Sequence, residues 1–186
     1  KATRLSGEFG LNTEHAYALT RDHAMANFFE SAASELKEDL DDPEAPGPIA
    51  EGAYKAAVAL MYNYFSTDLK GALNARGEEF EYMKITPAHF ADLVSFAFLK
   101  KISSRITKDL IPLMLDTGAD PHEIIKDRGM EQVSDESAIR AIIDKVIVAN
   151  PKAIEDYKAG KTNALQFLFG QAMKELKGAG SPDMIR

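Results

Sequence analysis

Outside the acidic stretch of residues 41–52, which is rich in proline and glycine, a short polar residue stands directly before a proline at four places in this 186-residue chain. The pairs are Thr86-Pro87, Asp120-Pro121, Asn150-Pro151 and Ser181-Pro182. Side chains of these four types can accept a hydrogen bond from one of the unpaired N–H groups that begin a helix. Proline suits the first helical position, because no helical hydrogen bond is required of its nitrogen. Each pair therefore predicts the start of a helix.

The rest of the chain also predicts an all-α protein. Apolar residues recur every three or four positions, and no stretch alternates apolar and polar residues between hairpin turns. Gly129 and Gly160 follow helical runs and predict helix ends, whereas Pro112 predicts a kink in its helix or an early end to it. The predicted helices cover residues 13–19, 22–40, 50–75, 87–100, 103–116, 121–128, 135–149, 151–159 and 162–177, and another begins at Ser181.

The composition changes along the chain in a way that predicts two helical subdomains. A shift after Asp116-Thr117-Gly118 separates a larger subdomain, residues 1–116, from a small one, residues 117–186. Residues 1–99 carry 8 Lys and Arg against 16 Asp and Glu, a net charge of −8. Residues 100–186 carry 14 against 13, a net charge of +1. Any polyanion is therefore expected to contact the C-terminal half.

The sequence lacks the cysteines of disulfide-bonded or thiolate-metal proteins, and it lacks the apolar segments of membrane-spanning or secreted proteins. The absence of cysteine excludes disulfides and thiolate metal sites. No apolar run approaches the roughly 18 residues of a membrane span, and no basic-then-apolar signal peptide opens the chain. The expectation is a cytoplasmic protein that does not contact membranes.

The sequence AGKT, residues 159–162, is similar to the end of a phosphate-binding loop. Such a loop has its first glycine five residues before the second, so that consecutive N–H groups can wrap a phosphate. Glu155 occupies that position here and would place a carboxylate against the phosphate. The sequence therefore predicts no nucleotide site at this stretch.

No other group of residues predicts catalysis. No pair among His15, His23, His89 and His122 has the spacing of metal ligands on one helix. Ser103 and Ser104 stand beside Arg105, which stays protonated and cannot act as a base. We expect this chain to contain no catalytic residue, cofactor site or metal site.

A helical wheel over residues 99–111 separates a basic face from an apolar one. Lys101, Arg105 and Lys108 are spaced i, i+4 and i+7 and share one side. Three cations with few acids among them could bind phosphate groups. The alternative is an ordinary solvated surface.

A second basic face is predicted in the helix over residues 162–177. Phe167, Gly170, Lys174 and Lys177 fall off its apolar stripe. Gly170 costs about 1 kcal/mol relative to alanine in a helix interior, so a close helix crossing or a close ligand backbone is expected to offset it. The face would suit an RNA backbone and an unstacked base. Alternatively, Phe167 packs under a neighbouring helix.

Several stretches together resemble the C-terminal region of the GatB family, the B subunits of the aspartyl/glutamyl-tRNA amidotransferases. The matching runs are Ile85-Thr86-Pro87, Lys101-Ile102-Ser103-Ser104-Arg105, Asn150-Pro151-Lys152-Ala153, Glu155-Asp156-Tyr157-Lys158-Ala159-Gly160-Lys161, Phe167-Leu168, Gly170-Gln171 and Met173-Lys174. The resemblance covers the chain from about Leu5 onward and implies a multihelical GatB/YqeY-type fold, a helical domain followed by a YqeY-like tail.

The resemblance also implies a function. The parent complex, with its A and C subunits, would convert Glu-tRNA(Gln) to Gln-tRNA(Gln) or Asp-tRNA(Asn) to Asn-tRNA(Asn), with ATP and Mg²⁺ bound in an N-terminal cradle that this sequence does not include. This region would bind the body of tRNA(Gln) or tRNA(Asn). The implied contacts are Lys101, Arg105, Lys108, Lys158, Lys161, Phe167, Gly170, Lys174 and Lys177. The alternative is a helical protein-interaction module with no direct RNA contact.

Overall fold

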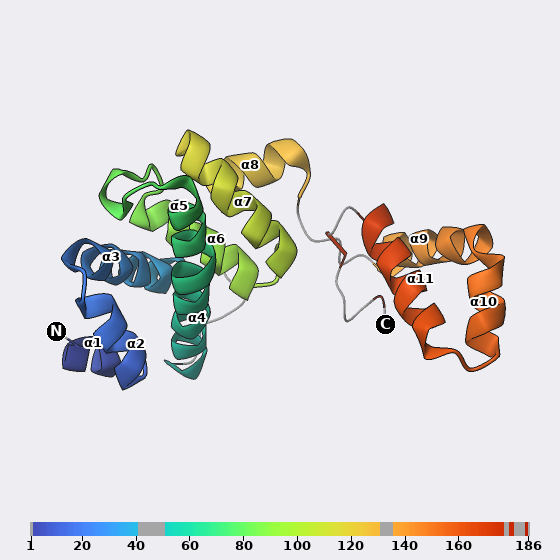
Figure 1. Ribbon diagram of the computed structural model, residues 1–186, viewed down its shortest axis with the longest axis horizontal. Coiled ribbons are helices and arrows are strands. Elements are labelled where there is room, and N and C mark those ends of the chain that lie inside the picture. Colours follow the sequence, from blue (N-terminus) through green and yellow to red (C-terminus); the bar gives the residue numbers. More distant parts are fainter. Residues whose placement is uncertain (1, 41–50, 131–135, 177–178, 181–184, 186) are drawn as a thin grey trace. The chain divides into compact units, whose positions relative to one another are not determined.

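The structure is a computed structural model, which describes residues 2–40, 51–130, 136–176, 179–180 and 185. Within these ranges the chain forms helices and no β-strand, which confirms the all-α prediction (Figure 1). The α-helices are α1 (Ala2–Phe9), α2 (Thr13–Thr20), α3 (His23–Leu40), α4 (Glu51–Asn63), α5 (Lys70–Arg76), α6 (Pro87–Phe98), α7 (Ser104–Thr117), α8 (Pro121–Arg128), α9 (Glu136–Ala149), α10 (Pro151–Lys158) and α11 (Thr162–Glu175). A π-helix, η1 (Tyr64–Leu69), joins α4 to α5, and a 3₁₀ turn, η2 (Phe80–Tyr82), precedes α6.

The polar residues before proline start helices as predicted, with one difference in mechanism. Thr86 Oγ1 accepts from the N–H of His89 at 3.1 Å, and Asp120 Oδ1 accepts from the N–H of His122 at 2.7 Å. Asn150 precedes α10 but makes no capping bond to it. Its Nδ2 instead donates to the Val146 carbonyl at 2.8 Å, so it satisfies the end of α9. The prediction at Ser181-Pro182 lies outside the described residues.

Two features of the helices differ from the predictions, and one of the two alternatives predicted at Pro112 is excluded. The sequence did not predict α1, whose buried residues are Leu5 and Phe9. The predicted helix 50–75 contains the π-helical segment η1. Pro112 does not end α7 early, since the helix continues to Thr117. The Pro112 carbonyl accepts from Arg76 Nη2 at 2.9 Å, which ties α7 to the end of α5.

The described residues divide into two compact units. The first comprises Lys1–Leu99 and Thr107–Arg128, and the second comprises Lys100–Ile106 and Gly129–Arg186. Helix α8 groups with the first unit, where it packs on α6. The boundary between residues 116 and 117 stays a prediction about domains.

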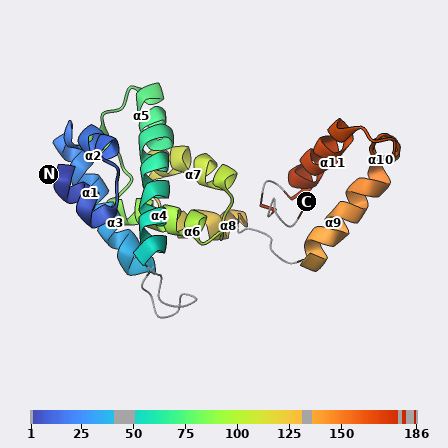
Figure 2. The ribbon, with the colours of Figure 1, turned by 90° about the horizontal axis from the view of Figure 1, so that it is seen from below.

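The first unit is built around aromatic side chains. α3 packs along α6, and α4, η1 and α5 form one long helical column beside them (Figure 2). Phe65 of η1 is buried at the centre, with its ring centroid 5.5 Å from those of both Phe29 and Phe80. Phe28 and Phe90 complete the cluster at 6.2 and 6.3 Å. These large rings supply much of the apolar area that stabilises the unit.

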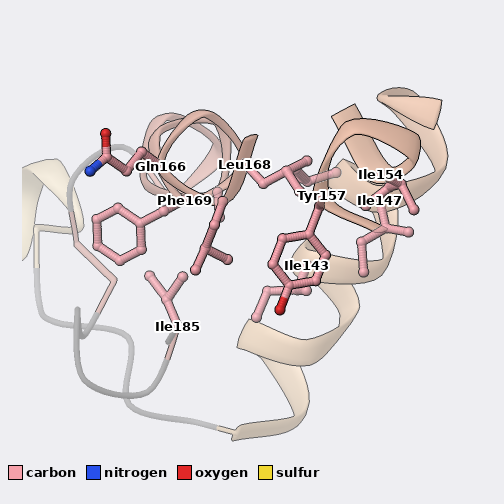
Figure 3. A pocket seen from close by; sticks show the side chains of 11 residues that line it. Ile143, Ile147, Ile154, Tyr157, Gln166, Leu168, Phe169 and Ile185 are labelled. Atoms are coloured by element: carbon pink, nitrogen blue, oxygen red, sulfur yellow. The ribbon is translucent and has the colours of Figure 1, made fainter. Parts of the chain in front are cut away.

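In the second unit, α9, α10 and α11 form three sides of a frame around an apolar groove of about 560 Å³. Figure 3 shows Ile147 of α9, Tyr157 of α10 and Phe169 of α11 among the side chains that line it, together with Ile185. In the described ranges, none of the helices combines the length and apolar character that a membrane crossing requires.

Candidate nucleic-acid interface

The turn at AGKT is the C-terminal cap of α10. Gly160 has φ +82°, a left-handed conformation that favours glycine. Its N–H donates to the Tyr157 carbonyl at 2.9 Å, and the N–H of Lys161 donates to the Asp156 carbonyl at 3.0 Å. This pair of bonds is a Schellman motif. Because both N–H groups are used by α10, they are not available to wrap a phosphate as a P-loop does, and Gly160 ends the helix as predicted.

The same turn fixes the position of the Lys161 side chain. Lys161 Nζ lies 2.7 Å from Asp156 Oδ1, so backbone and side chain of Lys161 both bond to Asp156. This hydrogen bond, together with the charge of Lys161, holds the pKa of the Asp156 carboxyl below its usual range, although burial acts in the opposite direction. Asp156 is therefore ionised at neutral pH.

A hollow of about 490 Å³ lies next to this ion pair. Its lining comes from the end of α9, from α10, from the turn that follows α10 and from the start of α11, and it includes Lys152, Asp156, Lys161, Asn163 and Phe167. Lys152 and Asn163 are exposed, and the Phe167 ring is 48% exposed. Two cations, an exposed amide and an accessible aromatic ring are thus among the groups that border one open space.

Helix α11 carries an exposed stripe that continues from the hollow. Asn163, Phe167, Gly170 and Lys174 are spaced i, i+4, i+7 and i+11 and share one face of the helix. All four are exposed. The structure therefore places three predicted contact residues together, and it adds Asn163 to them. We call these four residues the outer stripe of α11.

Gly170 has open space where its side chain would be. A Cβ built there meets no atom of the described residues within 4 Å, so a close helix crossing does not explain the glycine. We expect Gly170→Ala to raise the free energy of unfolding by about 0.5–1 kcal/mol, because alanine is the better helix former. Urea unfolding of the purified chain measures this change.

Gly160→Ala is the matched control, because the positive φ at Gly160 opposes any side chain there. This variant is expected to destabilise the chain. A loss of stability in Gly170→Ala would mean that the open space at Gly170 is filled in the folded chain.

The basic face predicted over residues 99–111 is only partly on a helix. Helix α6 ends at Phe98, and Lys100 takes a left-handed conformation with φ +57°. Helix α7 begins at Ser104, where the Ser103 hydroxyl accepts from the N–H of Ile106 at 3.3 Å. Lys101 therefore lies in the intervening turn, and its predicted helical register with Arg105 is wrong. The helical wheel treated residues 99–111 as one helix, whereas a new helix, α7, begins at Ser104.

The other predicted contacts have different surroundings. Arg105 and Lys108 are exposed on α7, and Lys108 Nζ lies 3.3 Å from Asp68 Oδ1 in η1. Lys158 is exposed in the last turn of α10 but does not line the hollow. Lys177 lies outside the described residues. Lys152 also lines the hollow and was not among the predicted contacts, since its proximity to α11 depends on the turn between the two helices.

The described part of the chain contains no group of three or more His, Asp and Glu side chains that could hold a metal ion. His15 stacks on Tyr62 with ring centroids 3.9 Å apart, and His122 lies 5.9 Å from the ring of Phe96. These rings serve packing.

Residues 50–186 match the model of the GatB domain, and this match covers most of the chain, including α10 and α11. The chain belongs to the GatB domain family. It is 33% identical over 184 residues to the B subunit of the aspartyl/glutamyl-tRNA(Asn/Gln) amidotransferase of Thermotoga maritima. It is 35% identical over 178 residues to the B subunit of the same name from Geobacillus kaustophilus.

These alignments cover 99% and 96% of this GatB-family chain, but only 34% and 33% of the two relatives. The chain thus spans about a third of the length of the curated relatives it matches. The family match confirms the resemblance and includes both the turn at Gly160 and the outer stripe of α11.

Proposed function

We propose that this chain is the tRNA-binding region of an amidotransferase B subunit, and that it contacts the body of tRNA(Gln) or tRNA(Asn). The parent complex would convert Glu-tRNA(Gln) or Asp-tRNA(Asn) to the amidated product in the cytoplasm, together with the A and C subunits. ATP and Mg²⁺ would bind in other parts of the parent. Support for the family comes from the GatB match, and support for tRNA comes from the names of the relatives.

The outer stripe of α11 is the observation that carries the proposal of RNA contact. Phe167 and Lys174 are exposed on one face, and nothing described fills the space beside Gly170 between them. An exposed aromatic ring can stack on a base of any sequence, and a lysine can neutralise a phosphate. The bare backbone at Gly170 lets a ligand approach closely. These properties suit an RNA strand better than a folded protein surface.

Removing one phosphate-binding cation is expected to weaken tRNA binding and to reduce its dependence on salt. We test three variants, Lys174→Met, Arg105→Met and Lys101→Met. In each, we expect the magnitude of the slope of log association constant against log salt concentration to decrease by about 1. Filter binding of the 186-residue chain to tRNA(Gln), tRNA(Asn) and an unrelated RNA at several salt concentrations measures both quantities.

Lys126→Met in α8 is the control, because it removes the same charge from an exposed position in the first unit. If all three test variants behave like this control, their residues do not contact RNA. If the chain binds a partner subunit with little salt dependence and does not bind tRNA, the protein-interaction alternative is favoured instead.

A further inference from the structure

The hollow between α10 and α11 has a composition that matches the parts of one nucleotide. Lys152, Lys161 and Asn163 offer donors suited to a phosphate, and Phe167 offers an exposed ring face to a base. Its volume of about 490 Å³ is within the range of small-molecule sites. The apolar groove on the other side of α11 offers neither lysine nor arginine in its lining.

Asp156 contributes the one carboxylate to the lining of this hollow, and that carboxylate bonds to Lys161. A phosphate oxygen that approached Lys161 would meet the negative charge of Asp156 at close range. For Lys161 to bind an incoming phosphate, its ammonium group must leave the Asp156 carboxylate and pair with the phosphate instead. The side chains of Lys161 and Asp156 are 65% and 35% exposed, so this exchange requires no rearrangement of the core.

The Schellman turn also fixes where the carboxylate meets Lys161. The backbone of Lys161 is bonded to the Asp156 carbonyl, and its side chain is bonded to the Asp156 carboxylate. The ammonium group is therefore held beside the hollow before any ligand arrives.

We propose that the hollow binds one unstacked RNA nucleotide, whose phosphate displaces the Asp156 carboxylate from Lys161 while its base lies against Phe167. This inference rests on the proposed function, because it assigns a place to the RNA that the chain binds. Asp156 then competes with the ligand for Lys161. Lys152 and Asn163 bind the same phosphate from the α10 and α11 sides of the hollow.

The test compares two variants that remove the same charge from neighbouring positions. Asp156→Asn removes the competing carboxylate, and Glu155→Gln removes an exposed carboxylate that does not line the hollow. Because an exposed ion pair of this kind has a small strength, we expect Asp156→Asn to bind tRNA(Gln) or tRNA(Asn) about two- to fivefold more tightly than Glu155→Gln does. Affinities are measured with the full 186-residue chain at one salt concentration.

A second measurement locates the ligand without a variant. In amide NMR spectra titrated with a short single-stranded RNA, the signals of Lys161, Asn163 and Phe167 are expected to shift, whereas those of Ile147 and Ile154 in the apolar groove stay in place. Equal affinities of the two variants, or shifts confined to the groove, would overturn the nucleotide site and leave tRNA binding standing. A chain that binds no RNA would overturn both proposals.

Discussion

Phe65→Ala is expected to lower the free energy of unfolding of the first unit by about 3–5 kcal/mol. Phe65 is 1% exposed, and its ring lies within 6.3 Å of four other aromatic rings. Removing it leaves a cavity among side chains from α3, η2 and α6, which cannot all move inward together. Urea unfolding followed by circular dichroism measures the loss.

The control for Phe65→Ala is Tyr82→Ala in η2. Tyr82 is 78% exposed, so this change is expected to alter stability by less than about 0.5 kcal/mol. A loss at Phe65 as small as that at Tyr82 would show that the aromatic cluster does not carry the stability of the unit. Because Phe65 lies in the first unit, the tRNA affinity of the folded molecules is expected to stay unchanged.

Phe167→Ala is expected to produce the largest loss of RNA affinity, about 5- to 150-fold. The basis is that stacking of a base on an aromatic ring contributes about 1–3 kcal/mol per base. Since the Phe167 ring is 48% exposed, its removal is expected to change the stability of the second unit much less than Phe65→Ala changes the first. Filter binding and thermal unfolding of the same preparation separate the two effects.

Tyr157→Ala provides a matched control for Phe167→Ala. Tyr157 is also an aromatic residue, 50% exposed, but it lines the apolar groove and not the hollow. We expect its removal to leave RNA affinity unchanged within about twofold, since less than about 0.5 kcal/mol is involved. An equal loss for both variants would indicate that RNA affinity reports the general integrity of the second unit.

The sequence predicted those elements that depend on local chemistry. Thr86 and Asp120 cap their helices through their own side chains, and Gly160 ends α10 through its own φ angle. These interactions span a few residues, so the residue types alone indicate them. The prediction over residues 99–111 failed at Lys101 because the cap at Ser103, also a local signal, was not used to interrupt the helical wheel.

Other features depend on contacts between distant residues and were not predictable in this way. Helix α1 has two buried anchors, Leu5 and Phe9, whose burial depends on the rest of the fold. The π-helix η1 inserts Phe65 into a cluster whose members come from four separate elements. In the candidate interface, Lys152 was missed for the same reason, whereas Asn163 could have been found from its spacing to Phe167.

The two glycines of the C-terminal helices differ in how much a substitution there can reveal. At Gly160, any side chain would disturb the turn and move Lys161 with it, because one motif sets both. Folding and recognition are therefore inseparable at that position, and selection for either would preserve the glycine. At Gly170, selection for folding and selection for recognition oppose each other, since folding alone would favour alanine. A glycine kept at position 170 across related chains would thus record selection for something other than stability.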